Sequence, residues 1–198
     1  MPKLSIIIPA YNSAKFIRNA LNSIKGQTFK DYELIVVCDS CEDDTEAIAK
    51  EYGARTARVH FHQDGQTRNA GLDMARGDWV LFMDDDDWWI TPDCLQKISD
   101  KLDATPDIDV LCFSFYFKGR GLATPRGNRG NHWIAVWNKA WRREFIADIR
   151  FSSVTMISDV DFHQRAFDKH PRVCDWDELI YYYNYLRKGS QNEKARRK

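Results

Sequence analysis

The sequence lacks a long hydrophobic run and an excess of charge of either sign. Its apolar start, residues 4–8, is interrupted by Pro9 and is too short for a signal sequence or a membrane span. The 29 basic and 29 acidic side chains give a net charge of +0, so no global charge attracts nucleic acid or an anionic membrane. These absences predict a cytoplasmic protein without a nucleic-acid partner, in at most peripheral contact with the inner face of a membrane.

The five cysteines do not follow the spacing of a zinc site. Cys38 and Cys41 form a C-x-x-C, but no second pair or histidine cluster follows at a suitable distance. A redox dithiol is the alternative interpretation, and the acidic stretch around the motif speaks against it by disfavouring thiolates. The pattern favours free thiols in a reducing compartment.

What the sequence does contain is an alternation of strand and helix patterns. Apolar runs predict strands at residues 4–9, 33–37, 56–61, 79–83, 109–117 and 178–186. Helical periodicity predicts helices at residues 13–25, 45–52, 66–75, 91–102 and 159–169. Short connections between strands that are apolar throughout indicate an α/β fold, with a mostly parallel central sheet and helices on both faces. No repeat or linker divides the chain, so we expect a single domain over residues 1–198.

Local signals place the ends of several elements. Asn12 or Ser13 is the expected N-cap of the first helix, and Thr91 with Pro92 marks the start of the fourth. Residues 118–133 lack periodicity and predict a long loop. The segment "VWNKAWRREFI" predicts the end of a strand followed by a helix.

Polar side chains follow three of the predicted strands where each strand ends. The segment from Pro9 to Asn12 follows the first strand, Asp39 and Ser40 follow the second, and Asp84 to Asp87 follow the fourth. Ligands of open parallel sheets bind beyond the carboxyl ends of the strands. Because the glycine fingerprints of dinucleotide folds and P-loops are absent, a phosphate ligand here would need cations, which carboxylates can supply by holding Mg²⁺ or Mn²⁺.

The four consecutive aspartates offer a metal site if the strand continues through them. Alternation would then place Asp84 and Asp86 on one face, and Asp85 and Asp87 on the other. One face would carry two carboxylates suited to a divalent cation.

Two other interpretations of the aspartates compete with a metal site. An EF-hand fails because the sixth and twelfth positions are Trp89 and Leu95 instead of Gly and Glu. A solvated acidic turn that caps the helix at Thr91 remains open. Trp88 and Trp89 speak against it, because they anchor the turn in apolar surroundings where unpaired charge is costly.

Four segments in order resemble glycosyltransferase family 2, whose members have the GT-A fold. They are "LSIIIPAYN", "ELIVVCDSCEDDT", "TRNAGLDMARGDWVLFMDDDDWW" and "SDVDF". The similarity extends over about residues 3–188, and "VWNKAWRREFI" and "YYYNYLRKGS" are similar to the bacterial surface-polysaccharide branch. The resemblance implies a nucleotide-diphospho-sugar donor, a divalent metal (Mn²⁺ or Mg²⁺) and an inverting transfer to a glycan or lipid-linked acceptor.

The resemblance also implies roles for residues of the donor site. Pro9, Ala10 and Tyr11 would line the nucleoside pocket. Asp39 would accept a hydrogen bond from a ring N–H of the base, most often uracil, and Arg68 would border the nucleotide.

The remaining implied roles concern the metal and the reaction. Asp84 and Asp86 match the D-x-D pair, with Asp84 toward ribose and metal, and Asp86 as the direct metal ligand. Asp85 would belong to the nucleotide-binding residues or shape the turn. Asp159 would be the general base that takes the proton of the acceptor hydroxyl, while the metal stabilises charge on the leaving diphosphate.

The chain departs from the family at two positions. Cys38 stands where the family has the first aspartate of Asp-Asp-Gly-Ser, and Ser158 stands where a glutamate precedes the base. Asp39 as a turn-forming residue and Asp159 as a helix-stabilising one are the structural alternatives. The Q-x-x-R-W element of processive synthases is absent, so we expect one sugar per encounter.

The predicted domain divides into a nucleotide-sugar-binding half (1–103), an acceptor-binding half (104–188) and a basic tail (189–198). A homodimer is one possible assembly.

Four further side chains could face the acceptor or the diphosphate, namely those of His132, Trp133, Arg142 and Arg143. They could instead belong to the core and to a solvated helix face. Tyr181 to Tyr183 are expected to pack within a strand.

Two other functions stay open. A degenerate, non-catalytic member would bind glycan or a partner transferase. A sugar nucleotidyltransferase would need a glycine-rich loop after the first strand, where the chain reads "PAYNSAKF".

Overall fold

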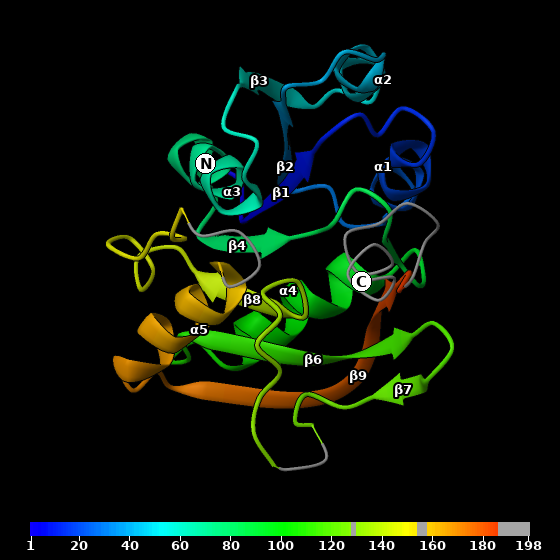
Figure 1. Cartoon of the computed structure of the whole chain (residues 1–198). Helices are drawn as coiled ribbons and strands as arrows, with labels where there is room; N and C mark the ends of the chain where they lie inside the picture. Colours follow the sequence, from blue (N-terminus) through cyan, green and yellow to red (C-terminus); the bar gives the residue numbers. More distant parts are fainter. Residues whose placement is uncertain (128–129, 154–157, 186–198) are drawn as a thin grey trace.

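The first half of the chain forms four parallel strands connected by helices (Figure 1). The computed structural model of the protein describes residues 1–127, 130–153 and 158–185, and the predicted basic tail lies outside them. The elements are β1 (Leu4–Ala10), α1 (Ile17–Lys25), β2 (Tyr32–Asp39), α2 (Thr45–Glu51), β3 (Arg55–Val59), α3 (Asp64–Met74) and β4 (Trp79–Phe82). β1 pairs with β2 and β4, and β2 pairs with β3, all in parallel.

The second half extends the same sheet with strands of both directions. Its elements are β5 (Trp88–Trp89), α4 (Cys94–Ala104), β6 (Val110–Phe117), β7 (Gly121–Ala123), β8 (Lys139–Arg142), α5 (Ser158–Asp168) and β9 (Val173–Tyr183). β8 lies antiparallel between β4 and β6, whereas β9 is parallel to β6. The strand order is β3-β2-β1-β4-β8-β6-β9-β5, with β7 paired to β6. The predicted α/β fold is confirmed, with its parallel part confined to the first half and to the β6–β9 pair.

Helices cover both faces of the sheet. On one face, Gly71 of α3 lies against Ile7 of β1, and Phe162 of α5 packs on Phe82, the register partner of Ile7. α1 lies on the opposite side of β1 (Figure 1) and is linked to α4 through Gln27, whose side chain accepts a hydrogen bond from Leu95 N at 2.9 Å. Among the described residues, no helix combines the length and the apolar character that crossing a membrane requires.

The predicted helix starts were wrong for α1 and α4. α1 begins at Ile17 and has no side-chain cap, because Ser13 instead directs its hydroxyl to Asp85. α4 begins at Cys94, and the Thr91 hydroxyl binds the Asp93 carboxylate without capping the helix.

Three further predictions differ from the structure. The strand before the aspartates ends at Phe82, and the aspartates form a turn in which Asp87 N donates to Asp84 O at 3.2 Å. The strand alternation assumed for these carboxylates is therefore wrong. The helix predicted after β8 is a series of turns over residues 143–148, and the predicted loop 118–133 contains β7.

Gly71 provides a test of how closely α3 packs on the sheet. An added Cβ at Gly71 would lie 2.3 Å from Ile7 Cγ2, so we expect Gly71→Ala to lower the free energy of unfolding by about 1–3 kcal/mol. Gly127→Ala is the matched control, because its added Cβ would have its nearest neighbour at 3.7 Å. Urea denaturation measures both, and equal losses would contradict close packing at Gly71.

Candidate active site

The segments that follow β1, β2 and β4 lie together at one edge of the sheet. Cys41 Sγ donates to Ala10 O at 3.3 Å and accepts a hydrogen bond from Asn12 N at 3.4 Å. The Ser13 hydroxyl donates to the Asp85 carboxylate. The segment after β1 is thus hydrogen-bonded directly to the segments after β2 and β4.

Unusual backbone conformations gather at this edge. Asn12, Ser40 and His62, which follow β1, β2 and β3, have φ values of 48°, 53° and 53°. Such left-handed conformations cost roughly 1–3 kcal/mol for residues other than glycine. Strain of this kind concentrates at functional sites, where the surrounding contacts enforce it.

The thiols of the C-x-x-C motif lie inside this edge. All five cysteines are free, Cys38 is buried and Cys41 is half-buried. A hydrogen bond from the Cys38 thiol lowers the pKa of Cys41 to about 7. Asp43 opposes this lowering of the Cys41 pKa, in the direction that the acidic stretch suggested.

Asp39 is engaged by its own chain. Its Oδ1 accepts hydrogen bonds from Phe61 N at 2.8 Å and Ser40 Oγ at 3.1 Å. Its Oδ2 accepts from Gln63 N at 3.0 Å and Thr67 Oγ1 at 2.9 Å. Burial alone would raise the pKa of Asp39, but hydrogen bonds from this segment lower it. A carboxylate has about four acceptor positions, and four donors of this chain already use those of Asp39. Asp39 therefore orders the start of α3, and its contact with a base stays a prediction.

Tyr11 is the accessible member of the three residues predicted to line the nucleoside pocket. Tyr11 is 59% exposed, whereas Ala10 is 3% exposed and Pro9 is half-buried. The Tyr11 ring lies edge-on to His62, with 6.5 Å between ring centroids. Tyr11 therefore offers an aromatic face beside the Asp39 loop, and Ala10 can offer its backbone.

Arg68 brings two predicted carboxylates together. Its Nη2 donates to Asp84 Oδ1 at 2.8 Å, and its Nη1 lies 3.6 Å from Asp159 Oδ1. Arg68 is 6% exposed, and its guanidinium lies over the Phe151 ring, 5.7 Å from the ring centroid. Burial alone would lower the pKa of Arg68, but Asp159 and Asp84 raise it.

The carboxylates around Arg68 carry more negative charge than this one cation neutralises. Burial raises the pKa of Asp84 to about 6, Arg68 opposes the rise, and Asp86 and Asp159 add to it. Asp84, Asp85 and Asp86 are each half-buried at the edge of the sheet. Carboxylate oxygens concentrated in this way suit a hard divalent cation.

Asp87 differs from its three neighbours because it is fully buried. Its carboxylate accepts hydrogen bonds from Tyr181 Oη at 2.7 Å and Asn184 N at 2.8 Å. Tyr181 Oη in turn accepts one from Asp84 N at 3.1 Å. The solvated-turn interpretation is wrong for Asp87, which attaches the turn to β9.

Tyr181 and Asn184 are site-supporting residues that the sequence analysis missed. Tyr181 was expected only to pack, and its ring does stack on Trp137 at 4.9 Å between centroids. A buried tyrosine hydroxyl usually has a hydrogen-bond partner, and that was the available signal. The partner itself is 94 residues away in sequence, so no local pattern identifies it.

Arg142 and Arg143 lie at the opposite edge of the sheet. Arg143 Nε donates to Gly77 O at 2.6 Å, and both arginines line a hollow with Lys3 and Asp78, at the amino-terminal ends of β1 and β4. The interpretation that they face the diphosphate is therefore wrong.

Comparison with known proteins identifies one family. Residues 5–169 match the model of Glycosyl transferase family 2. EpsH of Bacillus subtilis (strain 168), a protein named as a glycosyltransferase, is 32% identical over 174 residues, which cover 76% of this chain and 50% of EpsH. EpsJ of the same organism is 29% identical, over 92% of this chain and 61% of EpsJ. The chain thus spans between half and two thirds of the length of these relatives.

Solved structures with the same fold include TarS, named as a poly(ribitol-phosphate) beta-N-acetylglucosaminyltransferase of Staphylococcus aureus. TarS 1–349 in complex with UDP-GlcNAc matches with a TM-score of 0.83 and 27% identity, over 96% of this chain and 60% of that chain. The mannosyltransferase PcManGT of Pyrobaculum calidifontis matches with a TM-score of 0.77 and 17% identity, over 99% of this chain and 61% of that chain. At this identity the match shows a shared fold alone.

The Tyr181 hydroxyl can be tested by removing it. Tyr181→Phe leaves Asp84 N and one Asp87 oxygen without this partner, so we expect the free energy of unfolding to fall by about 1–3 kcal/mol. Tyr182→Phe is the control, because the described contacts of Tyr182 are ring stacks on Trp88 and Tyr116. We expect it to change stability by less than about 0.5 kcal/mol. Similar losses in both variants, measured by urea denaturation, would argue against the hydrogen-bonded link.

Proposed function

Because the chain belongs to glycosyl transferase family 2, we propose that it transfers a sugar from a nucleotide-diphospho-sugar to a glycan or lipid-linked acceptor by a metal-dependent, inverting reaction. The observation that carries the proposal is the cluster around Arg68. In this cluster Arg68 joins Asp84, a candidate ligand of the metal that binds the donor, to Asp159, a candidate base for the proton of the acceptor hydroxyl.

The proposed donor is a UDP-sugar. Related TarS structures, 27–28% identical to this chain, are named as complexes with UDP and with UDP-GlcNAc. In this chain, the exposed Tyr11 ring provides a face on which a base can stack. Ala10 and Asp39 lie next to this proposed position of the base. Both oxygens of Asp39 already accept hydrogen bonds from the protein, so the base would donate to an oxygen that has another donor.

The residues at the sheet edge fit a divalent cation. Asp84 and Asp86 would hold Mn²⁺ or Mg²⁺, because both are partly exposed carboxylates and these ions prefer oxygen ligands. When bound, the cation stabilises negative charge on the leaving diphosphate. The positive charge of Arg68 reduces the repulsion between the carboxylates. The hydrogen bond between Asp87 and Tyr181 holds the turn in place.

Asp159 is the proposed general base. It lies in the first turn of α5, with 28% of its side chain exposed and one oxygen 3.6 Å from Arg68 Nη1. Arg68 orients the carboxylate, which takes the proton of the acceptor hydroxyl as that oxygen attacks the anomeric carbon. A single displacement from the face opposite the leaving group inverts the configuration.

Donor binding is tested by thermal shift with UDP and Mn²⁺. We expect the Tm of the wild-type protein to rise, because a ligand at 100 times its Kd stabilises by about 2.7 kcal/mol. Asp86→Ala should lose this shift, whereas Asp100→Ala, an exposed position on α4, should keep it. An unchanged shift in Asp86→Ala, or no shift with any nucleoside diphosphate, would contradict the proposed metal site.

Catalysis is tested by metal-dependent hydrolysis of a panel of UDP-sugars. We expect Asp159→Asn to keep the thermal shift and to lower turnover by about 10²–10⁴-fold. Asp161→Asn is the control, because Asp161 lies on the same helix and pairs with Arg165. Binding without turnover in the wild-type protein would support the non-catalytic alternative. Pyrophosphate release from a nucleoside triphosphate would instead support a nucleotidyltransferase.

A further inference from the structure

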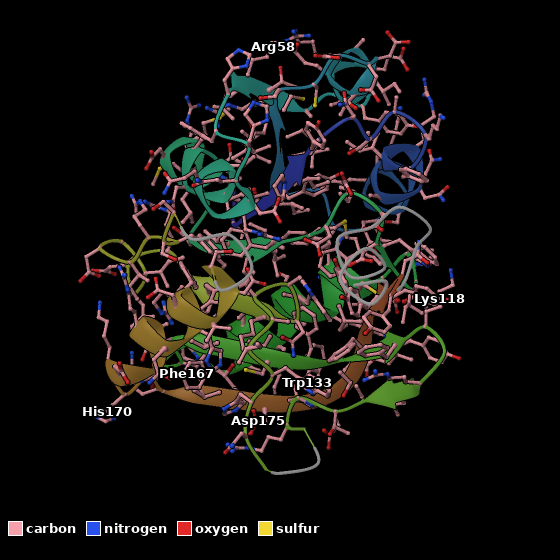
Figure 2. The ribbon with its side chains drawn as sticks, viewed as in Figure 1. Arg58, Lys118, Trp133, Phe167, His170 and Asp175 are labelled. Carbon is pink, nitrogen blue, oxygen red and sulfur yellow. The ribbon has the colours of Figure 1, made fainter. Side chains whose placement is uncertain are left out.

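A second group of potential metal ligands lies away from the aspartates. Cys112 on β6 and Asp175 on β9 are direct partners in the parallel ladder, and His132 comes from the segment between β7 and β8. The cysteine sulfur, one ring nitrogen and one carboxylate oxygen all lie within 4.8 Å of one another. Figure 2 shows Asp175 and Trp133 in the half of the molecule formed by β6 and β9, far from Arg58 on β3.

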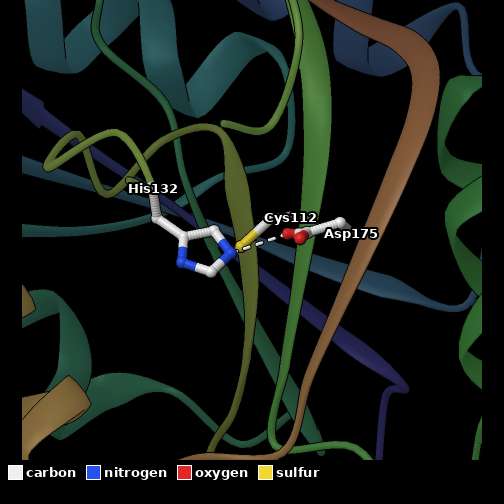
Figure 3. Close-up of side chains that lie close together, drawn as sticks. All are labelled: Cys112, His132 and Asp175. Atoms are coloured by element: carbon white, nitrogen blue, oxygen red, sulfur yellow. Dashed lines mark hydrogen bonds and ion pairs between the residues drawn. The ribbon is translucent and has the colours of Figure 1, made fainter. Parts of the chain in front are cut away.

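The three ligand atoms converge on one point. His132 Nε2 lies 2.7 Å from Asp175 Oδ1, and the Cys112 sulfur lies beside the same ring nitrogen (Figure 3). In a catalytic relay of Cys, His and Asp, the sulfur and the carboxylate would contact different nitrogens of the imidazole ring. Here both lie at the same nitrogen, as ligands of one metal ion would. Bonds of about 2.3 Å to sulfur and about 2.0–2.2 Å to nitrogen and oxygen would hold such atoms roughly 3.3–3.8 Å apart, so small movements suffice to accommodate a tetrahedral ion.

The ligand types suit a soft or borderline cation. A neutral imidazole such as that of His132 can bind a metal through a ring nitrogen. A metal coordinated by Cys112 would deprotonate its thiol. The thiolate and Asp175 together would then neutralise a divalent ion.

Two cations next to the site have partners of their own. Lys139 neighbours Cys112 in the antiparallel ladder, and its ammonium donates to Trp133 O at 2.6 Å and to Ala135 O at 2.7 Å. Arg126 Nε donates to Asp175 Oδ2 at 2.6 Å. Arg126 therefore holds one oxygen of Asp175 and leaves Oδ1 toward His132, which is the usual arrangement of an outer partner of a metal-binding carboxylate.

We propose that Cys112, His132 and Asp175 bind Zn²⁺ at a site separate from Asp84 and Asp86. Sulfur and imidazole ligands favour zinc over Mn²⁺ and Mg²⁺, so the two sites differ in metal preference. Cys112 is fully buried, whereas 10% of the His132 side chain and 31% of the Asp175 side chain are exposed. The fourth position of the ion would face solvent on the side of His132 and Asp175. The site would link the segment that carries His132 to β6 and β9.

The test uses Zn²⁺ and Co²⁺ alone with the full chain. We expect about one zinc per chain by mass spectrometry after dialysis, and a lower Tm after removal by a chelator. Co²⁺ should give a thiolate-to-metal charge-transfer band that is lost in Cys112→Ser and in His132→Gln, two variants that alter different elements. Arg126→Gln should weaken Zn²⁺ binding by about 10–100-fold.

Two controls separate this site from other thiols and from the aspartates. Cys174→Ser, one residue from Asp175 on β9, should keep the cobalt band, and so should Asp86→Ala. A wild-type protein that retains no zinc and gives no charge-transfer band would overturn the proposal. A band that survives in Cys112→Ser, or disappears in Cys174→Ser, would do the same. These outcomes do not depend on UDP binding, so they are distinguishable from a failure of the proposed transferase function.

Discussion

The contact of Arg68 with Asp84 and Asp159 joins residues that are 16 and 91 positions away from it in sequence. A buried guanidinium without carboxylate partners would be strongly unfavourable, so α3, the turn after β4 and the start of α5 must lie together. The face of α3 that carries Arg68 is fixed in turn by Gly71, which allows the helix to approach Ile7 of β1. The position of the site therefore depends on close packing beneath it as much as on the charges within it.

The four consecutive aspartates show why a local pattern predicts a site and not its arrangement. Asp84 pairs with Arg68, Asp85 accepts from Ser13, and Asp87 is buried against Tyr181. Their sequence environment is nearly the same, but their partners come from α3, the β1 loop and β9. Each aspartate thus has the role that its tertiary partner imposes, and strand alternation could not anticipate this because the strand ends before the run.

The parallel half of the fold was predictable because its signals are local. Apolar runs and helical periodicity predicted β1 to β4 and α1 to α3 within a few residues. The second half was harder, because β8 is only four residues long and lies between two strands with which it is antiparallel. The sequence also placed Asp39 at the correct edge. It could not show that Phe61, Gln63 and Thr67 already occupy the carboxylate, since these donors follow β3.

β9 connects the two clusters of the second half through its irregular pairing with β6. Cys112 pairs with Asp175 and Phe115 pairs with Tyr181, so the four residues from Cys112 to Phe115 on β6 face the seven residues from Asp175 to Tyr181 on β9. Register shifts on both sides of Ser114 accommodate the extra residues, as β-bulges do. Without them, a regular ladder would bring a different residue of β9 opposite Phe115, and Tyr181 would not lie beside Asp87. The irregularity is therefore what lets one strand hold Asp175 beside Cys112 at one end and support the aspartate turn at the other.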